Sequence, residues 1–295
     1  MRFLNPKTDF AFKKIFGSPE SGDILVSFLN AMLDLHGDDR VASVQILDPY
    51  LAPPILGIKN TYVDVRATDQ AGRQHIIEMQ VINHRGLEER VLYNACKAVA
   101  GQLQEGVDYV ALQEVVSLVI TDFEMFPEVN GLRHSFRLRT ADGRTYSDKL
   151  QLVFIELPKF GKQASELSDT FDRWAYFMRE ARKLDEIPAE LASDEDVAHA
   201  MRLANLAGMS AEDLEAHRKR EDFLYIVREG YVLARQQGEA AGEARGEARG
   251  EARGIEIGAT RARDQTWAEA IARLMATGMT EAQARAMLGL LPRGV

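Results

Sequence analysis

The chain has 295 residues, and 46% of them are hydrophobic, so it is long enough for one sizeable core plus a further module. Its single cysteine, Cys96, excludes a disulfide framework and cysteine-based zinc sites, and the six histidines show no ligand spacing. The net charge of −9 argues against broad, non-specific coating of nucleic acid, because phosphates are neutralised by clustered lysine and arginine. A local basic rim around a site is compatible with that charge.

The chain is expected to be cytoplasmic. Its N-terminus lacks the apolar core of a signal peptide, and no run approaches ~18 consecutive apolar residues, so neither export nor a membrane span is predicted. A single cysteine also fits a reducing compartment.

The first 160 residues are predicted to form an α/β domain. Apolar residues at helical spacing predict helices, and alternating or continuous β-rich runs predict strands. In chain order the predicted elements are a short helix over 9–16, a helix starting at Ser18-Pro19, strands over 41–47, 59–68 and 74–81, a helix over 87–104, and strands over 115–121, 132–139 and 149–156. The strand over 115–121 is almost continuously apolar, which is typical of a sheet position buried on both faces.

The strands on either side of Gly72 are predicted to pair as a hairpin. Side chains two apart on a strand share a face, so Glu78 and Gln80 project together, and Asp64 on the neighbouring strand is expected to converge with them. A carboxylate pair with open positions suits a hard cation such as Mg²⁺, which can also hold phosphate oxygens and a nucleophilic water. The hairpin therefore predicts phosphodiester hydrolysis.

Both acids have simpler explanations. Asp64 can be an edge aspartate that pairs with Arg66 or with solvent. Glu78 lies in the otherwise apolar run 76–81, where a carboxylate is unfavourable unless it is paired or bound to metal. The pattern at Glu78 is therefore harder to explain without a site.

Beyond residue 160 the composition becomes helical, so a domain boundary is expected there. Helices are predicted over 166–184, 189–206 and 211–234. Residues 238–258 repeat Gly-Glu-Ala-Arg, and this period stacks like charges at i, i+4 on a helix. The repeat is interpreted either as a flexible or partly helical linker or as a homotypic helical association element, in which Glu faces Arg of a partner helix.

The last segment, 259–295, is predicted to contain two short helices around Gly278. Thr280 and Gln283 have the spacing of a capping box. An ordinary helical hairpin is the simpler interpretation, and a helix-turn-helix that reads DNA is the alternative.

Several motifs occur in an order that resembles the PD-(D/E)XK nuclease superfamily, and more specifically the recombination-promoting nuclease / putative transposase family of bacteria. The motifs are residues 8–17 (TDFAFKKIFG), 63–66 (VDVR), 77–80 (IEMQ) and 90–97 (RVLYNACK). The match is good over about the first 160 residues and only stylistic in the helical remainder.

The resemblance implies a metal-dependent DNA endonuclease with a PD-(D/E)XK-like core, in the order helix, three strands, helix, strand around a mixed central sheet, followed by a helical C-terminal region. Asp64, Glu78 and the carbonyl of Met79 would hold Mg²⁺, or Mn²⁺. Asp9 would add a third acidic ligand, or would only cap the first helix. The activity implied is DNA breakage in recombination or mobile-element biology.

The chain departs from the superfamily at Gln80, where lysine is usual. A glutamine amide can orient water by hydrogen bonding, but it cannot supply the positive charge of lysine. Lys97 is the predicted replacement, with Arg90 and Tyr93 on the same helical face and Gln102 beyond them as further substrate-binding residues. Lys97 as a solvated surface residue is the alternative.

Two further functions stay open. The chain can be a catalytically weak or inactive DNA-binding or assembly protein of the same fold, with homo-oligomers formed through the helical C-terminal region. A toxin- or phage-defence-type interaction protein, regulated by its own C-terminal fragment, is the third possibility.

Overall fold

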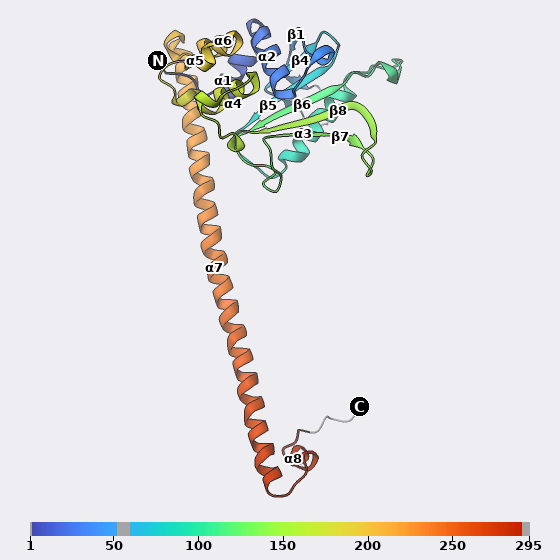
Figure 1. Ribbon diagram of the computed structural model, residues 1–295, viewed down its shortest axis with the longest axis vertical. Helices are drawn as coiled ribbons and strands as arrows, with labels where there is room; N and C mark the ends of the chain where they lie inside the picture. Colours follow the sequence, from blue (N-terminus) through green and yellow to red (C-terminus); the bar gives the residue numbers. More distant parts are fainter. Residues whose placement is uncertain (1, 52–59, 291–295) are drawn as a thin grey trace. The chain divides into compact units, whose positions relative to one another are not determined.

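A computed structural model of the protein describes residues 2–51 and 60–290. The chain divides into two compact units, Met1–Tyr225 and Ile226–Val295. The first unit is built around a mixed sheet of six strands, with helices on both faces (Figure 1). This arrangement confirms the predicted α/β fold with a mixed central sheet and a helical C-terminal region.

The helices of the first unit are α1 (Asp9–Phe16), α2 (Gly22–Leu33), α3 (Leu87–Ala100), α4 (Thr170–Glu180), α5 (Ala189–Ala192), α6 (Glu195–Leu203) and the start of α7 (Ala211–Ala276). The strands are β1 (Val44–Leu47), β2 (Tyr50–Leu51), β3 (Thr61–Tyr62), β4 (Val65–Asp69), β5 (Gln74–Gln80), β6 (Val115–Thr121), β7 (Arg133–Arg139) and β8 (Thr145–Glu156).

The main sheet has the order β1-β4-β5-β6-β8-β7. β5, β6 and β8 run parallel, whereas β1, β4 and β7 pair antiparallel with their neighbours. Every residue of β6 is buried between β5 and β8, as its continuous apolar sequence predicts. The turn between β4 and β5 needs glycine, because Gly72 has a φ of 82°.

The larger core lies on the sheet face that α1, α2, α4 and α6 cover. Its centre is Trp174 of α4, whose ring lies 5.7 Å from Phe16 of α1 and 5.4 Å from Phe28 of α2. Helices beyond residue 160 therefore complete the hydrophobic core to which α1 and α2 contribute. For this reason the compact unit extends through Tyr225, past the composition change.

On the opposite face, α3 packs against the sheet. Val91 of α3 shares a small apolar cluster with Val119 of β6 and Phe154 of β8.

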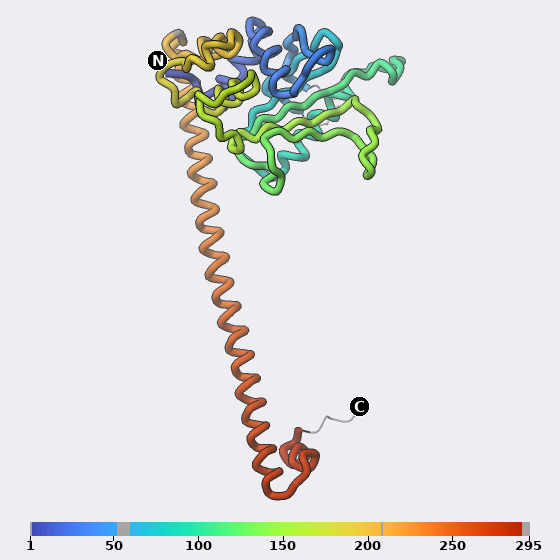
Figure 2. The backbone as a smooth tube through the Cα atoms, viewed as in Figure 1, coloured from blue at the N-terminus to red at the C-terminus, as the bar shows by residue number. Residues whose placement is uncertain are grey.

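The N-terminal segment contacts a distant part of the first unit. The N–H of Leu4 donates to the carbonyl of Ala204 over 2.7 Å, so the N-terminal segment runs beside the segment that leads into α7 (Figure 2).

The predicted strand over 59–68 was wrong as a single element. Thr61–Tyr62 pair with β2 in a separate two-stranded sheet, and the six-stranded sheet is joined only from Val65 onward. Residue 59 lies outside the described residues. The strand expected from 41 begins at Val44, because the Asn30 side chain binds both the N–H and the carbonyl of Val41.

Several predicted helices have different bounds, among them the helix predicted over 166–184, which is α4 over Thr170–Glu180. Ser18 does not cap a helix: a 3-10 turn follows it, and α2 begins at Gly22. The helix predicted over 189–206 is two helices, because the Asp194 side chain accepts from the N–H of Val197 and starts α6. The helix predicted over 87–104 ends at Ala100, next to Gly101.

α7 is one continuous helix of 66 residues that contains both the predicted helix over 211–234 and the Gly-Glu-Ala-Arg repeat. It is followed by a turn at Gly278 and by α8 (Glu281–Met287), whose predicted capping box between Thr280 and Gln283 is present. Across the described residues, no helix is both long enough and apolar enough to cross a membrane.

Candidate active site

Asp64 and Glu78 lie on the same face of the hairpin. The β4–β5 ladder pairs Val65 with Ile77 and Arg66 with Ile76, so one further step places Asp64 opposite Glu78. Directly opposite residues of an antiparallel pair point to one side of the sheet. Both side chains accordingly line a single cleft of about 260 Å³. The structure thus brings together the two acids that the sequence pairs.

Asp64 comes directly before β4, and its side chain takes the part of a backbone group in pairing with β5. Its Oδ2 accepts the backbone N–H of Met79 over 2.8 Å, a position that a carbonyl of β4 would otherwise take. The N–H and C=O of a strand residue point to the same side, so the Met79 carbonyl faces this edge as well. The carbonyl of Gln80, in contrast, accepts from Asp122 on the β6 side.

Glu78 is held from two directions, and its side chain is only 4% exposed. Asn94 of α3 donates to its Oε1 over 3.1 Å, and the Gln80 amide donates to Oε2 over 3.1 Å. The guanidinium of Arg90, one turn before Asn94 on α3, lies 3.4 Å from Oε2. The face of α3 that covers this side of the sheet therefore supplies two of the partners of Glu78, and β5 itself supplies the third.

Both carboxyl groups resist ionisation. Burial raises the pKa of Asp64 to about 7, with the charges of Glu78 and Asp9 adding to the rise and the Met79 N–H and Lys13 opposing it. Burial likewise raises the pKa of Glu78, against the opposing effects of Asn94 and Arg90. Two buried carboxyl groups whose pKa values are raised in one cleft are a pattern typical of functional sites.

Asp9 reaches the same cleft from α1. It does not cap the helix, because the N-cap is Thr8, whose hydroxyl accepts from the N–H of Ala11. Lys13, one turn later, lies 2.8 Å from Asp9 and 4.0 Å from Asp64. Lys13 belongs to the first of the quoted motifs, but no sequence pattern indicated a role for it.

Three predicted residues lie outside the cleft lining. The ammonium of Lys97 lies 3.3 Å from the Thr61 hydroxyl and over the ring of Tyr93, and burial lowers its pKa. Lys97 is therefore buried and not the solvated residue of the alternative interpretation. Gln102 bridges to the backbone of Gln113 through both ends of its amide, which ties down the loop after α3. Their catalytic and binding roles stay predictions.

One wall of the cleft comes from a segment that no sequence pattern places there. Arg220, Phe223 and Leu224, from the early turns of α7, line it opposite the hairpin residues. The only signal was the basic run Arg218-Lys219-Arg220, and nothing in its spacing relates it to the hairpin.

The donors at the cleft fit a hard divalent cation. Asp64, Glu78 and the edge-facing carbonyl of Met79 offer oxygen atoms, which Mg²⁺ and Mn²⁺ prefer. The Oδ1 atom of Asn94, buried beside Glu78, has no hydrogen-bond partner among the described residues. Within the described part of the chain no three acidic, histidine or cysteine side chains form a metal cage, so water and substrate oxygens would have to complete the coordination.

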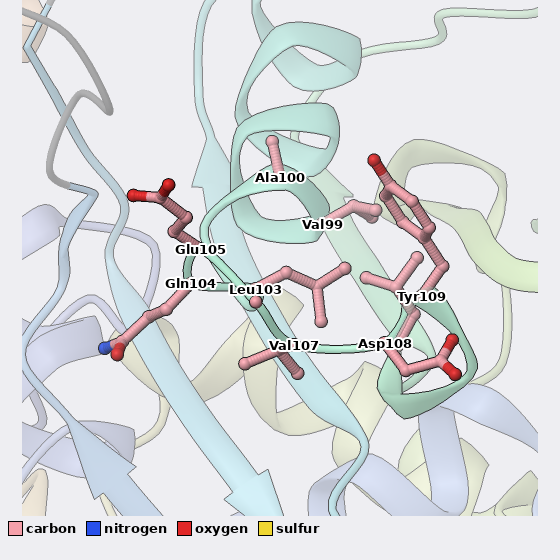
Figure 3. A pocket seen from close by; sticks show the side chains of 10 residues that line it. Val99, Ala100, Leu103, Gln104, Glu105, Val107, Asp108 and Tyr109 are labelled. Carbon is pink, nitrogen blue, oxygen red and sulfur yellow. The ribbon is translucent and has the colours of Figure 1, made fainter.

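A larger cavity of about 970 Å³ lies at the far end of α3 (Figure 3). Its lining is mostly apolar, including Val99, Leu103 and Val107, and it contains neither of the paired acids. The Asp108 carboxylate there accepts from the N–H of Val110 and so serves its own loop. The chemistry of the molecule therefore points to the smaller cleft.

Comparison with known proteins agrees with this geometry. A family model described as "PD-(D/E)XK nuclease family transposase" matches residues 6–226, which is more than half of the chain. No curated protein and no solved structure matches the chain. The matched range covers the hairpin, α3 and the part of α7 that lines the cleft. The chain therefore belongs to the PD-(D/E)XK nuclease family transposases, which gives it a nuclease- or transposase-related role.

Proposed function

We propose that the protein is a divalent-metal-dependent endonuclease that hydrolyses phosphodiester bonds in DNA, in recombination or mobile-element activity. The observation that carries the proposal is the position of Asp64 opposite Glu78 in one cleft, within a chain of a nuclease family. PD-(D/E)XK nucleases generally use divalent metals, and the donor set fits one.

The residues around the acid pair have defined tasks in this proposal. Asp64, Glu78 and the Met79 carbonyl would hold the cation, which when bound would polarise the scissile phosphate and lower the pKa of an attacking water. Asn94 and the Met79 N–H fix the two carboxylates in place. The Gln80 amide can orient a water molecule, but it adds no charge.

The positive charge that lysine usually provides needs another source. The sequence pattern assigns it to Lys97, whereas the ammonium of Lys13 lies 4.0 Å from the Asp64 carboxylate. We propose Lys13 for this task, because developing charge on a phosphate is stabilised only by a cation close to it.

Cleavage of supercoiled plasmid by the full chain tests the proposal. With Mg²⁺ or Mn²⁺ the wild type should nick or linearise the plasmid, and with EDTA it should not. Asp64→Asn and Glu78→Gln should each lower the rate at least about 100-fold, as loss of a metal ligand does. Asp148→Asn removes an exposed carboxylate of β8 and is the matched control. An Asp64→Asn protein that cleaves at the wild-type rate would contradict the proposal.

The alternative, a catalytically weak DNA-binding or assembly protein, is favoured by Gln80 and by the repeat of α7. On this helix the Gly stripe has the Glu stripe on one side and the Arg stripe on the other, because successive residues are 100° apart. Within one helix, Glu243, Glu247 and Glu251 repel one another at i, i+4. A second copy of the helix relieves this repulsion.

The geometry of the stripes favours a parallel pair. A two-fold axis along the helices puts the Glu side of one copy beside the Arg side of the other, whereas an antiparallel pair puts Glu beside Glu. A variant with Arg245, Arg249 and Arg253 changed to Glu should lose self-association in sedimentation experiments. Mixing it with a variant whose Glu243, Glu247 and Glu251 are changed to Arg should restore a dimer. If neither change affects association, the repeat is not the interface.

A further inference from the structure

The first turns of α7 are attached to α1 in a way that sets which residues reach the cleft. The ammonium of Lys14 lies 3.0 Å from the carboxylate of Asp213, and His217, one turn on, is buried. Residues 213, 217, 220 and 224 follow at i, i+4, i+7 and i+11, so they share one helical face. Arg220 and Leu224 consequently line the cleft within the first unit.

Arg220 differs from the other long cations of the cleft lining. Lys7 is paired with Asp122 at 2.8 Å, and Arg90 lies 3.4 Å from Glu78. Among the described residues, Arg220 forms no ion pair. Its guanidinium instead lies over the ring of Phe223, 5.5 Å from the ring centroid. A cation–π contact holds the plane of a guanidinium while leaving its N–H edge available.

The cleft needs such a cation. Asp9, Asp64 and Glu78 all line it, so a polyanion that enters meets like charge. An arginine without an acidic partner can bind phosphate through two parallel N–H groups, which lysine cannot do. An arginine fixed on an aromatic ring loses little side-chain freedom when it binds.

We propose that Arg220 binds a backbone phosphate of the DNA strand that flanks the phosphate facing Asp64 and Glu78, and that Phe223 is the positioning residue for its guanidinium. This inference rests on the proposed nuclease function and adds α7 to the DNA-binding surface of the site.

Fluorescence anisotropy of a labelled duplex tests it, with every variant in the full chain carrying Asp64→Asn so that DNA stays intact. Arg220→Gln should weaken binding about 5- to 10-fold and reduce the slope of log K against log salt by about 1, as the loss of one phosphate contact does. Phe223→Leu should give a smaller loss in the same direction.

The matched control is Lys219→Gln. Lys219 is the neighbouring residue on α7, but its side chain is 74% exposed and pairs with Glu215. This variant removes the same charge from the same helical turn, and its affinity should stay within about twofold of the parent, as for an exposed ion pair. In the nuclease with Asp64 retained, Arg220→Gln should raise KM with little change in kcat.

The two proposals fail separately. If the wild type cleaves DNA and Arg220→Gln matches Lys219→Gln in affinity, salt slope and KM, the role of Arg220 is refuted while the nuclease stands. If no metal supports cleavage and binding still depends on Arg220 and not on Lys219, the nuclease proposal fails and the phosphate contact holds. A parent protein that does not bind DNA overturns the inference.

Discussion

The backbone N–H of Met79 donates to Oδ2 of Asp64, so the residue that follows one acid of the site holds the other acid in place. The bond replaces a step of the β4–β5 ladder, and it ties Asp64, in the bend just before β4, to the neighbouring strand β5. Functional groups that are held by strands are positioned more accurately than groups on loops. The same bond explains why Asp64 stays in the cleft although burial and neighbouring carboxylates oppose its charge.

Asp64→Asn should stabilise the metal-free protein at neutral and alkaline pH. The amide oxygen can still accept the Met79 N–H, while the buried charge and its repulsion with Glu78 are removed. The folded-state pKa of Asp64 is about 7 and lies above its ordinary value of 3.8, so the folded state binds more protons between these two pH values. Wild-type stability therefore falls as pH rises through that range.

The expected gain in the free energy of unfolding is about 1–3 kcal/mol above pH 7 and close to zero below pH ~4. Urea denaturation of wild type and variant at pH 4 and pH 8, in EDTA, measures it. Asp148→Asn, an exposed aspartate, should show no such pH-dependent gain. A gain that is equal at both pH values would show that charge at Asp64 is not its cause.

Divalent metal should stabilise the wild type and not the Asp64→Asn variant. A ligand that binds only the folded state raises the apparent stability, by about 2.7 kcal/mol at 100 times its Kd. Metal must displace protons from Asp64, so the rise in Tm with Mg²⁺ or Mn²⁺ should shrink as pH falls below about 7. Thermal denaturation with a metal titration at pH 6 and pH 8 checks this, and equal shifts in the two proteins would place the metal elsewhere.

The hairpin and its acid pair could be predicted from the sequence because both depend on local pattern. Alternation sets the face, the turn at Gly72 sets the register, and the two together bring Asp64 to Glu78. The contribution of α7 could not be predicted, because Arg220 reaches the cleft only through tertiary contacts such as Lys14 with Asp213. Local patterning carries no information about such a contact.

Glu156 shows a second limit. Like Glu78, it is a buried acid at the end of an apolar strand, so the pattern alone does not separate the two. The structure does, because Glu156 accepts the N–H groups of Met125 and Phe126 and contacts His134 and Lys159 at 2.7 and 2.6 Å. These donors lower the pKa of Glu156 although burial alone would raise it, whereas the pKa of Glu78 is raised.

Glu156→Gln should therefore destabilise the protein, by about 2–4 kcal/mol, because it leaves buried donors without a charged acceptor. A carboxylate whose pKa is lowered in the folded state stabilises the fold at pH values above the pKa of the unfolded state. This stabilisation is lost as the pH falls through the pKa of the folded state. The difference between wild type and variant should accordingly be full at pH 7 and shrink below pH ~4. Urea denaturation across that range measures it. Glu78→Gln, the matched change at the site, should not destabilise at pH 7, and similar losses for both variants would contradict this distinction.

Replacing the cations one at a time identifies which lysine serves the reaction. Lys13→Met should lower kcat about 10- to 100-fold, because it removes the positive charge near Asp64 from the transition state. Lys97→Met should reduce Tm through loss of its contact with Thr61 and leave kcat within about threefold.

Adding Gln80→Lys to Lys13→Met should recover part of the rate, because position 80 projects beside Glu78, 3.1 Å from its Oε2. Single-turnover cleavage of a labelled duplex at saturating metal separates these cases. If Lys97→Met abolishes cleavage while the variant stays fully folded, and Lys13→Met does not, then Lys97 is the lysine that serves the reaction. Lys13 would then only form its ion pair with Asp9.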